Sequence, residues 1–392
     1  MPGARGLVLG ALCLLGALGR PPAGRREVSM HFNPGWNDSS VNLLHVRAVD
    51  ANSTLHYVWS SLGVPAVLLL YTENKHSTLH INWTQLLSPE PAGAIWVEPP
   101  SSVLHASAVV FTKLFEYDGA NASGPAHALF YPPYDLAAFS WDSVNQTLNH
   151  TALTAAFRGT GPPRTFHNGS IAFQVTAYEE SSRDRRLPGL LHTANSSKLE
   201  FVMNGVAPRG NSSRFMLEML MVEGPGRHRR LESVRSIDDE YTPTIFEMVQ
   251  LVSEPQGTQA GPGFLQWKTT AYGAREAKRE NGIRCRYSPL QAVNGTLLGP
   301  SIARAYFGKD VGGLAAINIS FGGEDGEIYS STGYLSWSVL LGFGTPPEDA
   351  FSPLVVAIMA VALGTPVVLL VAGAIVVLFF QKKRYSEYEP IN

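Results

Sequence analysis

Cysteine is nearly absent from this sequence of 392 residues, which contains only Cys13 and Cys285. Because we expect the segment around Cys13 to be removed, a single thiol remains, and it has no partner within the chain for a disulfide. Two cysteines also exclude the usual cysteine-rich zinc sites. We expect Cys285 to be a small buried hydrophobe; an intermolecular disulfide or a reactive thiol stays open as an alternative.

Charged residues are also scarce, and neither sign predominates. Lysine and arginine total 30 against 32 aspartates and glutamates, a formal net charge of −2, so the basic excess of a nucleic-acid-binding protein is missing. Charged residues make up 16% of the chain, below the roughly 25% of an average soluble protein. Hydrophobic residues reach 45%, which is enough for a sizeable core. Something other than charge must therefore keep the surface soluble.

Familiar catalytic signatures are missing as well. The sequence has no HExxH, GxSxG or phosphate-binding loop, and no cluster of cysteine and histidine at metal-binding spacing. The acidic runs Asp238–Glu240 and Glu324-Asp325 could supply the paired carboxylates of a glycosidase. The second run lies among three glycines, however, which favours a hairpin turn. We therefore predict a protein that is not an enzyme, with no catalytic residue, no cofactor and no metal.

Acceptor sites for N-linked glycans explain how so weakly charged a surface stays soluble. The Asn-x-Ser/Thr sequon occurs eleven times, where chance would give roughly two or three occurrences. Bulky polar glycans would cover the surface and hinder proteases. The predicted N-glycosylation sites are Asn37, Asn52, Asn82, Asn121, Asn145, Asn149, Asn168, Asn195, Asn211, Asn294 and Asn318.

Residues 1–24 have the features of a secretory signal peptide. Arg5 supplies the charged start, Gly6–Leu18 forms an apolar run, and Ala17-Leu18-Gly19 offers the small residues that signal peptidase needs. An apolar run of 13 residues is too short for a membrane span, which takes about 20. A buried helix at the start of the fold is the alternative.

A second apolar run, Leu354–Phe380, predicts a transmembrane helix. Its 27 residues contain no charge, and as a helix it would be about 40 Å long against a hydrocarbon core of about 30 Å, so we expect tilting or bending, with Pro366 at the bend. Lys382–Arg384 follow the run, whereas Glu348 and Asp349 precede it. This asymmetry predicts a type I protein with a cytosolic C-terminus and residues from about 25 to 350 in the lumen.

The predicted span carries one candidate packing site. Ala360 and Gly364 lie four residues apart, and small residues at this spacing let two transmembrane helices approach closely. The alternative is a generic span in which small residues are merely tolerated.

The predicted cytosolic tail, residues 381–392, ends in a sorting signal. Tyr388, Glu389, Pro390 and Ile391 place a bulky apolar residue three positions after a tyrosine. Clathrin-adaptor medium chains bind such peptides as an added strand and take the two side chains into pockets. Pro390 favours the extended form that this requires. The sequence therefore predicts an adaptor partner and delivery to the lysosomal membrane.

Between the two ends, alternation of apolar and polar residues predicts antiparallel β-sandwich domains, so that the chain is mainly β with one C-terminal transmembrane helix. Sequon residues Asn82 and Asn318 fall on the expected solvent faces of their strands. Helical periodicity is confined to Ala274–Glu280, which could equally be a charged loop. The expected strands are Leu43–Val49, Ala66–Tyr71, Leu79–Trp83, Val103–Phe115, Ile171–Tyr178, Phe215–Val222, Thr244–Val252, Ile317–Phe321 and Leu335–Leu341.

A polar stretch at Glu179–Arg186 suggests a division, so we predict luminal domains at residues 25–185 and 186–341, followed by a stalk at 342–353. Arg183–Arg186 and Arg227–Arg230 match the pattern that proprotein convertases cut; exposed charged loops are the preferred interpretation. Leu187–Leu191 matches the leucine motif of nuclear-receptor coactivators. Its proline and glycine oppose the helix that this motif needs, so we regard the match as a coincidence.

The eleven histidines could take the formal charge from −2 towards +9 on acidification. We expect the luminal fold to tolerate this change, with histidines such as His80 at solvent-facing positions.

From Val28–Gly35 to Tyr385–Asn392, the sequence resembles the glycosylated lysosomal membrane protein family. The resemblance implies a non-enzymatic lysosomal membrane protein that is the accessory subunit of a major-facilitator-type transporter. In that role it would protect its partner, an exporter of dipeptides, from luminal proteolysis. A membrane-anchored lysosomal hydrolase or a glycan-binding receptor is the alternative, and two carboxylates converging in one pocket would favour it.

Overall fold

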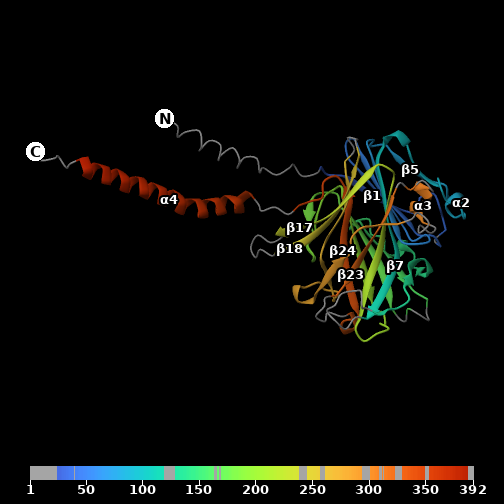
Figure 1. Ribbon diagram of the computed structural model, residues 1–392. Helices are drawn as coiled ribbons and strands as arrows, with labels where there is room; N and C mark the ends of the chain where they lie inside the picture. The colour runs from blue at the N-terminus through green and yellow to red at the C-terminus, as the bar shows by residue number, and fades with distance from the viewer. Residues whose placement is uncertain are drawn as a thin grey trace, which may run out of the picture. The chain divides into compact units, whose positions relative to one another are not determined.

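A computed structural model describes residues 24–38, 40–118, 129–162, 166, 169–237, 245–256, 261–293, 301–308, 311, 313–322, 329–348 and 353–386. The chain divides into two compact units. One comprises residues 22–236 and 246–348 and is rich in strands, and the other contains the C-terminal helix α4 (Pro353–Ser386). Antiparallel strands predominate, as Figure 1 shows, which confirms the predicted mainly β class with one apolar C-terminal helix.

The first sheet of the strand-rich unit is antiparallel throughout. Along it, neighbouring strands are β1 (Glu27–Phe32), β2 (Leu43–Val49), β3 (Thr54–Ser60), β4 (Ala66–Thr72), β7 (Val103–Asp118), β16 (Ser213–Glu223) and β23 (Gly313–Phe321). β8 (Leu129–Phe130) and β9 (Tyr134–Asp135) also pair with β7, and β21 (Gly282–Tyr287) and β22 (Gln291–Val293) also pair with β23.

The second sheet faces the first across the core. Its neighbouring strands are β10 (Ser140–Trp141), β11 (Thr154–Thr160), β12 (Ser170–Ala177), β15 (Ser196–Asn204), β24 (Tyr334–Phe343), β19 (Gly263–Lys268) and β18 (Ile245–Pro255). β20 (Thr270–Tyr272) pairs with both β24 and β21 and so joins the two sheets. Two short hairpins complete the pairing: β5 (Thr78–Ile81) with β6 (Ile95–Glu98), and β13 (Ser182–Arg183) with β14 (Leu191–His192).

Residue 185 does not divide this unit. β12 ends before it and pairs with β15, which begins after it, and β7 pairs with β16 in the same way. The domains expected at 25–185 and 186–341 are therefore one compact unit. The expected stalk also begins too early, because Gly344 N donates to Pro262 O (2.7 Å) and Gln266 Nε2 donates to Pro347 O (2.8 Å). These bonds hold residues 344–347 against the second sheet.

The main core lies between the sheets and is rich in aromatic side chains. Trp267 of β19 and Trp337 of β24 meet edge to face, with ring centroids 6.0 Å apart, and Phe201 and Phe215 pack in the same cluster. Alternation explains this arrangement, because every second residue of a strand points inward. Ile317, Ile319 and Phe321 line one face of β23, as predicted, and Cys285 is buried in the same core.

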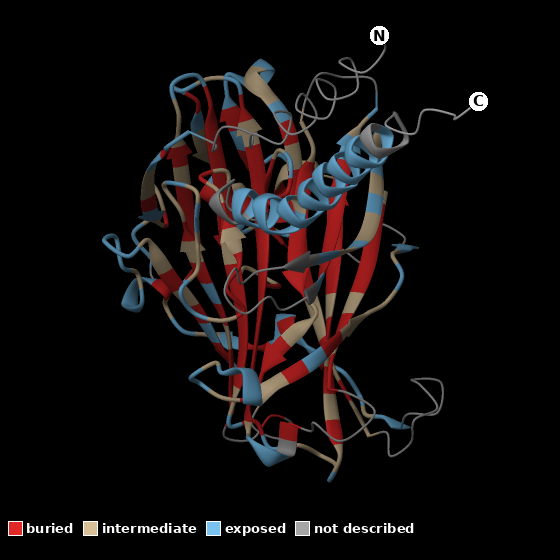
Figure 2. Cartoon of the chain, turned by 90° about the vertical axis from the view of Figure 1, so that its left-hand side faces the viewer, coloured by how far each residue is buried: buried red, intermediate tan, exposed pale blue. Residues whose placement is uncertain are grey.

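The outer faces of both sheets are covered as well. α3 (Ile302–Phe307) packs on β4, β6 and β7, and together with α2 (Trp83–Leu86) it forms a second apolar cluster on the first sheet. A third cluster, which includes Leu190, Phe264 and Leu340, covers part of the second sheet. All seven residues of β3 and all ten of β24 are consequently buried, and Figure 2 shows these sheets largely in red.

One local prediction is corrected, and one open alternative is decided in favour of a loop. The strand expected over Leu79–Trp83 ends at Ile81, because Asn82 is the N-cap of α2 and its Oδ1 accepts from Gln85 N (3.1 Å). Ala274–Glu280 forms no α-helix; bends there lead into the 3₁₀ turn η5. The 3₁₀ turns are η1 (Pro100–Ser102), η3 (Leu136–Ala138), η4 (Val144–Gln146), η5 (Arg279–Asn281) and η7 (Tyr329–Ser331).

Candidate functional site

Eight of the eleven predicted glycan acceptors lie among the described residues. Six of these asparagines are exposed, as a glycan requires: Asn37, Asn52, Asn82, Asn145, Asn149 and Asn211. Asn195 and Asn318 are only partly exposed. The remaining three, Asn121, Asn168 and Asn294, lie outside the described residues.

The two partly exposed acceptors are held within the fold. Asn195 Oδ1 accepts from Nε of the buried Arg26 (2.6 Å), and its backbone oxygen accepts from the Tyr57 hydroxyl (2.8 Å). Asn318 lies in β23, where its buried Oδ1 has no hydrogen-bond partner among the described residues. A glycan at either position would have to project outward between ordered neighbouring residues.

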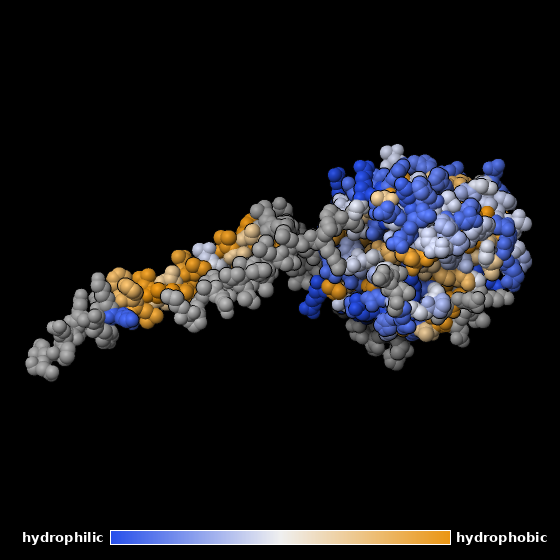
Figure 3. Space-filling view, turned by 90° about the horizontal axis from the view of Figure 1, so that it is seen from above, coloured by the Kyte–Doolittle hydropathy of each residue, from blue (hydrophilic) through white to orange (hydrophobic). Residues whose placement is uncertain are grey.

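The apolar helix α4 has the length and composition of a membrane span. Val356–Lys382 has a mean hydropathy of 2.6 over its most apolar window, none of which is buried. Figure 3 shows largely orange atoms along this helix. Pro366 lies inside it, and the Thr365 hydroxyl donates to Val361 O (2.6 Å). Ala360 is exposed, and a Cβ added at Gly364 would meet no atom within 4 Å apart from the helix's own backbone. Residues 1–23, with the expected signal peptide, and Tyr388–Ile391 lie outside the described residues.

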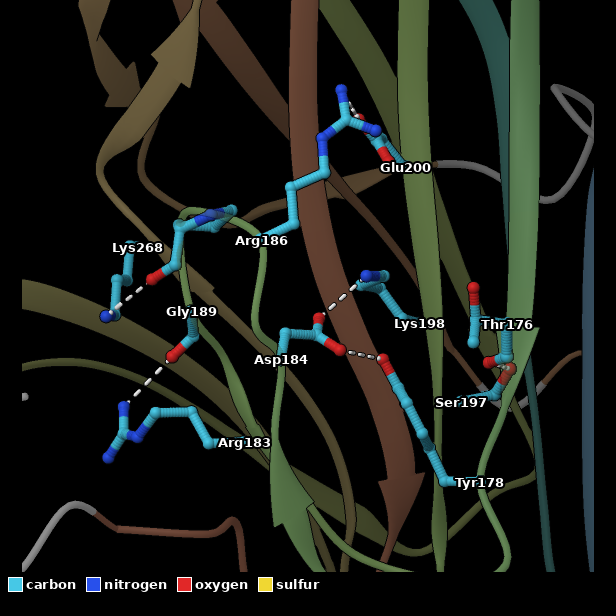
Figure 4. Close-up of polar contacts among 11 residues, drawn as sticks. Thr176, Tyr178, Arg183, Asp184, Arg186, Gly189, Ser197, Lys198, Glu200 and Lys268 are labelled. Carbon is cyan, nitrogen blue, oxygen red and sulfur yellow. Dashed lines mark hydrogen bonds and ion pairs between the residues drawn. The ribbon is translucent and has the colours of Figure 1, made fainter. Parts of the chain in front are cut away.

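The first arginine-rich run is built into the surface of the second sheet (Figure 4). The Asp184 carboxylate accepts from Lys198 Nζ (2.7 Å) and from the Tyr178 hydroxyl (2.9 Å), and Arg183 donates to Gly189 O (2.9 Å). The side chains of Asp184 and Lys198 are only 12% and 14% exposed. This is an ordered segment held at several points, so the expected exposed charged loop is only partly correct.

The residues that follow tie the same segment to β19. Lys268 is almost completely buried, and its Nζ donates to Pro188 O (2.7 Å). Gly189 has a φ of +61°, a left-handed conformation that suits glycine, and Leu190 is buried in the third apolar cluster. Leu187–Leu191 therefore forms no helix, in agreement with the view that its coactivator motif is a coincidence.

The second arginine-rich run lies in a strand. Arg227–Arg230 opens β17 (Arg227–Ile237), where the side chains alternate in exposure. Arg229 Nε lies 2.7 Å from a carboxylate oxygen of the completely buried Glu223, and Arg229 also donates to Gly313 O (2.7 Å). The expected basic loop is wrong here, because the run lies in a strand. Arg229 supplies the charged partner that the buried Glu223 carboxylate needs.

A polar cluster that sequence reasoning missed surrounds Glu116 of β7. Its completely buried carboxylate accepts from the Tyr134 hydroxyl (2.8 Å) and the Ser213 hydroxyl (2.6 Å), and Arg209 Nε lies 3.3 Å away. Burial and this carboxylate raise the pKa of Tyr134. The Arg209 guanidinium also lies over the Tyr134 ring, 4.0 Å from its centroid. A carboxylate so fully occupied is suited to holding the fold and not to transferring protons.

The described part of the chain gives little support for metal binding or for catalysis by paired carboxylates. No group of three or more histidine, cysteine or acidic side chains there could hold a metal ion. The groove lined by Pro132, Tyr134, Phe139 and Arg209 contains one carboxylate, that of Asp135. Both acidic runs of the sequence, 238–240 and 324–325, lie outside the described residues.

Four described histidines are buried, contrary to the expectation of solvent-facing positions: His45, His56, His105 and His192. His45 Nε2 lies 3.0 Å from His56 Nδ1, and His56 Nε2 lies 2.9 Å from the Ser77 hydroxyl. Burial lowers the pKa of His56 to about 3 and that of His45 well below its usual value, with neighbouring positive charge adding to both shifts. His80 is partly exposed, as expected, beside Glu98.

The described residues form a compact β unit with exposed sequons and one apolar helix, and the sequence relatives align over nearly this whole length. A family model described as glycosylated lysosomal membrane protein matches residues 42–384. The chain belongs to this family. It is 51% identical to glycosylated lysosomal membrane protein A of Xenopus laevis over 98% of each chain. It is 46% identical to the human glycosylated lysosomal membrane protein, over 94% of this chain and 91% of that one, and 43% identical to the Danio rerio protein.

Proposed function

We propose that this member of the glycosylated lysosomal membrane protein family is an accessory subunit that protects a major-facilitator-type lysosomal transporter, an exporter of dipeptides, from luminal proteolysis. In this proposal the strand-rich unit lies in the lumen, α4 crosses the membrane, and Tyr388 and Ile391 bind a clathrin adaptor that delivers the chain. The family resemblance supplies the partner class.

The observation that carries the proposal is the closure of the strand-rich unit. Proteases cut segments that open locally, and opening is rare where strands are central and apolar faces are covered. Here the outer faces of both sheets carry apolar clusters, and Asp184 and Glu223 hold the described arginine-rich segments in place. Such a unit is suited to persist among hydrolases and to cover a less protected partner.

The face of α4 that contains Ala360 and Gly364 is the proposed contact with the transporter. Small side chains let helix backbones approach within the membrane, where close packing replaces hydrophobic exclusion. Ala360→Leu with Gly364→Leu keeps the span apolar and should therefore insert normally. At matched lysosomal amounts, this double variant should recover less of a multi-span partner and should shorten the lifetime of that partner.

The matched control enlarges the same two residue types on the opposite side of the helix. At 100° per residue, Ala362 and Gly373 lie about 180° from the proposed face. Ala362→Leu with Gly373→Leu should therefore leave recovery of the partner unchanged. Equal recovery with both double variants would reject the helix contact. An unchanged partner lifetime when the whole chain is removed would reject the protective role.

A further inference from the structure

Three sequons have a third residue that the fold buries completely. Thr54, Ser197 and Ser213, which complete the sequons of Asn52, Asn195 and Asn211, are each 0% exposed. Transfer of a glycan needs that third residue, because the hydroxyl-bearing Ser or Thr is what distinguishes a sequon from any other asparagine. A transferase therefore has to reach both ends of the tripeptide, and an exposed asparagine alone is insufficient.

Each of the three hydroxyls is already engaged inside the fold. Thr54 Oγ1 donates to Asn74 O (2.9 Å), Ser197 Oγ donates to Thr176 O (2.8 Å), and Ser213 Oγ donates to the Glu116 carboxylate (2.6 Å). Figure 4 shows the second of these contacts. An enzyme that binds these hydroxyls would have to break the bonds and leave buried acceptors unpaired.

The three residues also lie in strands with neighbours on both sides. Thr54 begins β3 between β2 and β4, Ser197 lies in β15 between β12 and β24, and Ser213 begins β16, which pairs with β7 and β23. Central strands open only with a free energy close to that of global unfolding. Local motions of the folded unit would therefore not present these tripeptides.

Two other sequons differ in each of these respects. Asn82 caps the four-residue helix α2, and its third residue, Thr84, is exposed. Asn149 lies in a turn where its Oδ1 accepts from Thr151 N (3.0 Å), and Thr151 is exposed as well. Opening a single turn presents either tripeptide while both sheets stay intact.

We propose that Asn52, Asn195 and Asn211 accept glycans only before the strand-rich unit folds, whereas Asn82 and Asn149 remain acceptors afterwards. In each transfer the asparagine nitrogen bonds to the anomeric carbon of a lipid-linked oligosaccharide diphosphate. The bond from that carbon to the diphosphate oxygen breaks, the lipid diphosphate leaves with the electron pair, and one amide proton is lost to a base. Folding and glycosylation therefore compete at the first three sites. This inference rests on the luminal orientation proposed above.

The test separates early from late transfer on the full chain. The chain is translated into microsomes with a reversible inhibitor of the transferase at a dose that leaves every sequon partly empty. After translation stops, the inhibitor is washed out. The microsomes are then opened with detergent, a brief trypsin treatment selects folded molecules, and mass spectrometry measures the occupancy gained at each asparagine. Late gain at Asn52, Asn195 and Asn211 should be lower by about tenfold or more than at Asn82 and Asn149.

The control is a variant in which the strand-rich unit cannot fold. Trp337→Ala removes a buried ring from the centre of β24 and should keep the unit open, so late transfer should then fill all five sites in molecules scored without trypsin. Equal late gain at all five sites of the folded wild-type chain would overturn the inference. If the orientation were wrong instead, no sequon would carry a glycan even without inhibitor.

Discussion

Acidification should destabilise the strand-rich unit, and His56 should account for a measurable part of the loss. Thr72 Oγ1 lies 3.1 Å from Thr54 O, which can only accept, so Thr72 donates there and accepts from Ser77 (2.7 Å). Ser77 in turn accepts from His56 Nε2–H, and His56 Nδ1 accepts from His45 Nε2–H. The hydrogen bonds thus run in one direction through two neutral imidazoles. A second proton on His56 would face the donor of His45.

The size of the effect follows from proton linkage. An unfolded histidine titrates near pH 6.5, whereas burial, helped by the charge of Arg47, lowers the pKa of folded His56 to about 3. Stability is therefore fully present above pH 6.5 and is lost as the pH falls towards 3. At about pH 5 the loss is ~2 kcal/mol, from 1.36 kcal/mol per pH unit. His105, whose pKa burial also lowers to about 3, should add a similar amount.

The assay is denaturant unfolding of the full chain in detergent at about pH 7.5 and about pH 5, followed by fluorescence of the buried Trp267 and Trp337. His56→Gln should destabilise at neutral pH by about 1–3 kcal/mol, because Ser77 and His45 lose their partner. Its deficit against wild type should shrink by ~2 kcal/mol at the lower pH. His150→Gln, at an exposed position, is the matched surface substitution. The same deficit for His56→Gln at both pH values would refute the reasoning.

Three further outcomes are expected. A glycosidase that removes N-glycans should lower the apparent mass by an amount that fits many chains, and a shift of one or two would contradict a glycan coat. Tyr388→Ala and Ile391→Ala should each move the protein towards the cell surface, and unchanged lysosomal residence of both would mean that another signal directs it. Asp184→Ala leaves Lys198 and Tyr178 without a partner and should lower the free energy of local opening by about 1–3 kcal/mol. Tryptic cleavage at Arg183–Arg186 should therefore speed up by roughly 5- to 150-fold. Glu232→Ala, which removes a partly exposed carboxylate that pairs with Arg230, is its control, and equal cleavage of the two variants would show that Asp184 does not hold the segment.

The sequence predicted most closely the strands in which apolar residues predominate. Leu43–Val49 matches β2 at both ends, and the expected strands at 103–115 and 215–222 lie within β7 and β16. β3 was missed, although Leu55, Tyr57 and Trp59 alternate with polar residues; only Val58 breaks the alternation, and all seven residues are buried. The elements that cover the outer faces, α3 on the first sheet and the segment around Leu190 on the second, lie far away in the sequence from the strands they cover. Local pattern contains no information on such coverage.

The polar sites were not predicted either, because they too depend on residues that are distant in the sequence. Glu116 has no motif around it, and its partners come from two separate segments, one with Tyr134 and the other with Arg209 and Ser213. The sequons were visible as tripeptides, but the burial of the third residue depends on which strands become central. Sequence therefore predicted where glycans can attach, and only the fold distinguishes acceptors that remain accessible from those that do not.

Burial of polar side chains inside the strand-rich unit has two chemical consequences, and both bear on when the chain folds. Buried imidazoles, such as those of His45 and His56, make the fold less stable in acid than at neutral pH. Buried sequon hydroxyls, such as that of Ser213, require glycans to be attached before the sheets form. Both favour a chain that folds once, at near-neutral pH and with its glycans in place, and that has no need to reopen in the lysosome. An enzyme with a mobile active site would need such reopening, whereas a protective subunit works best without it.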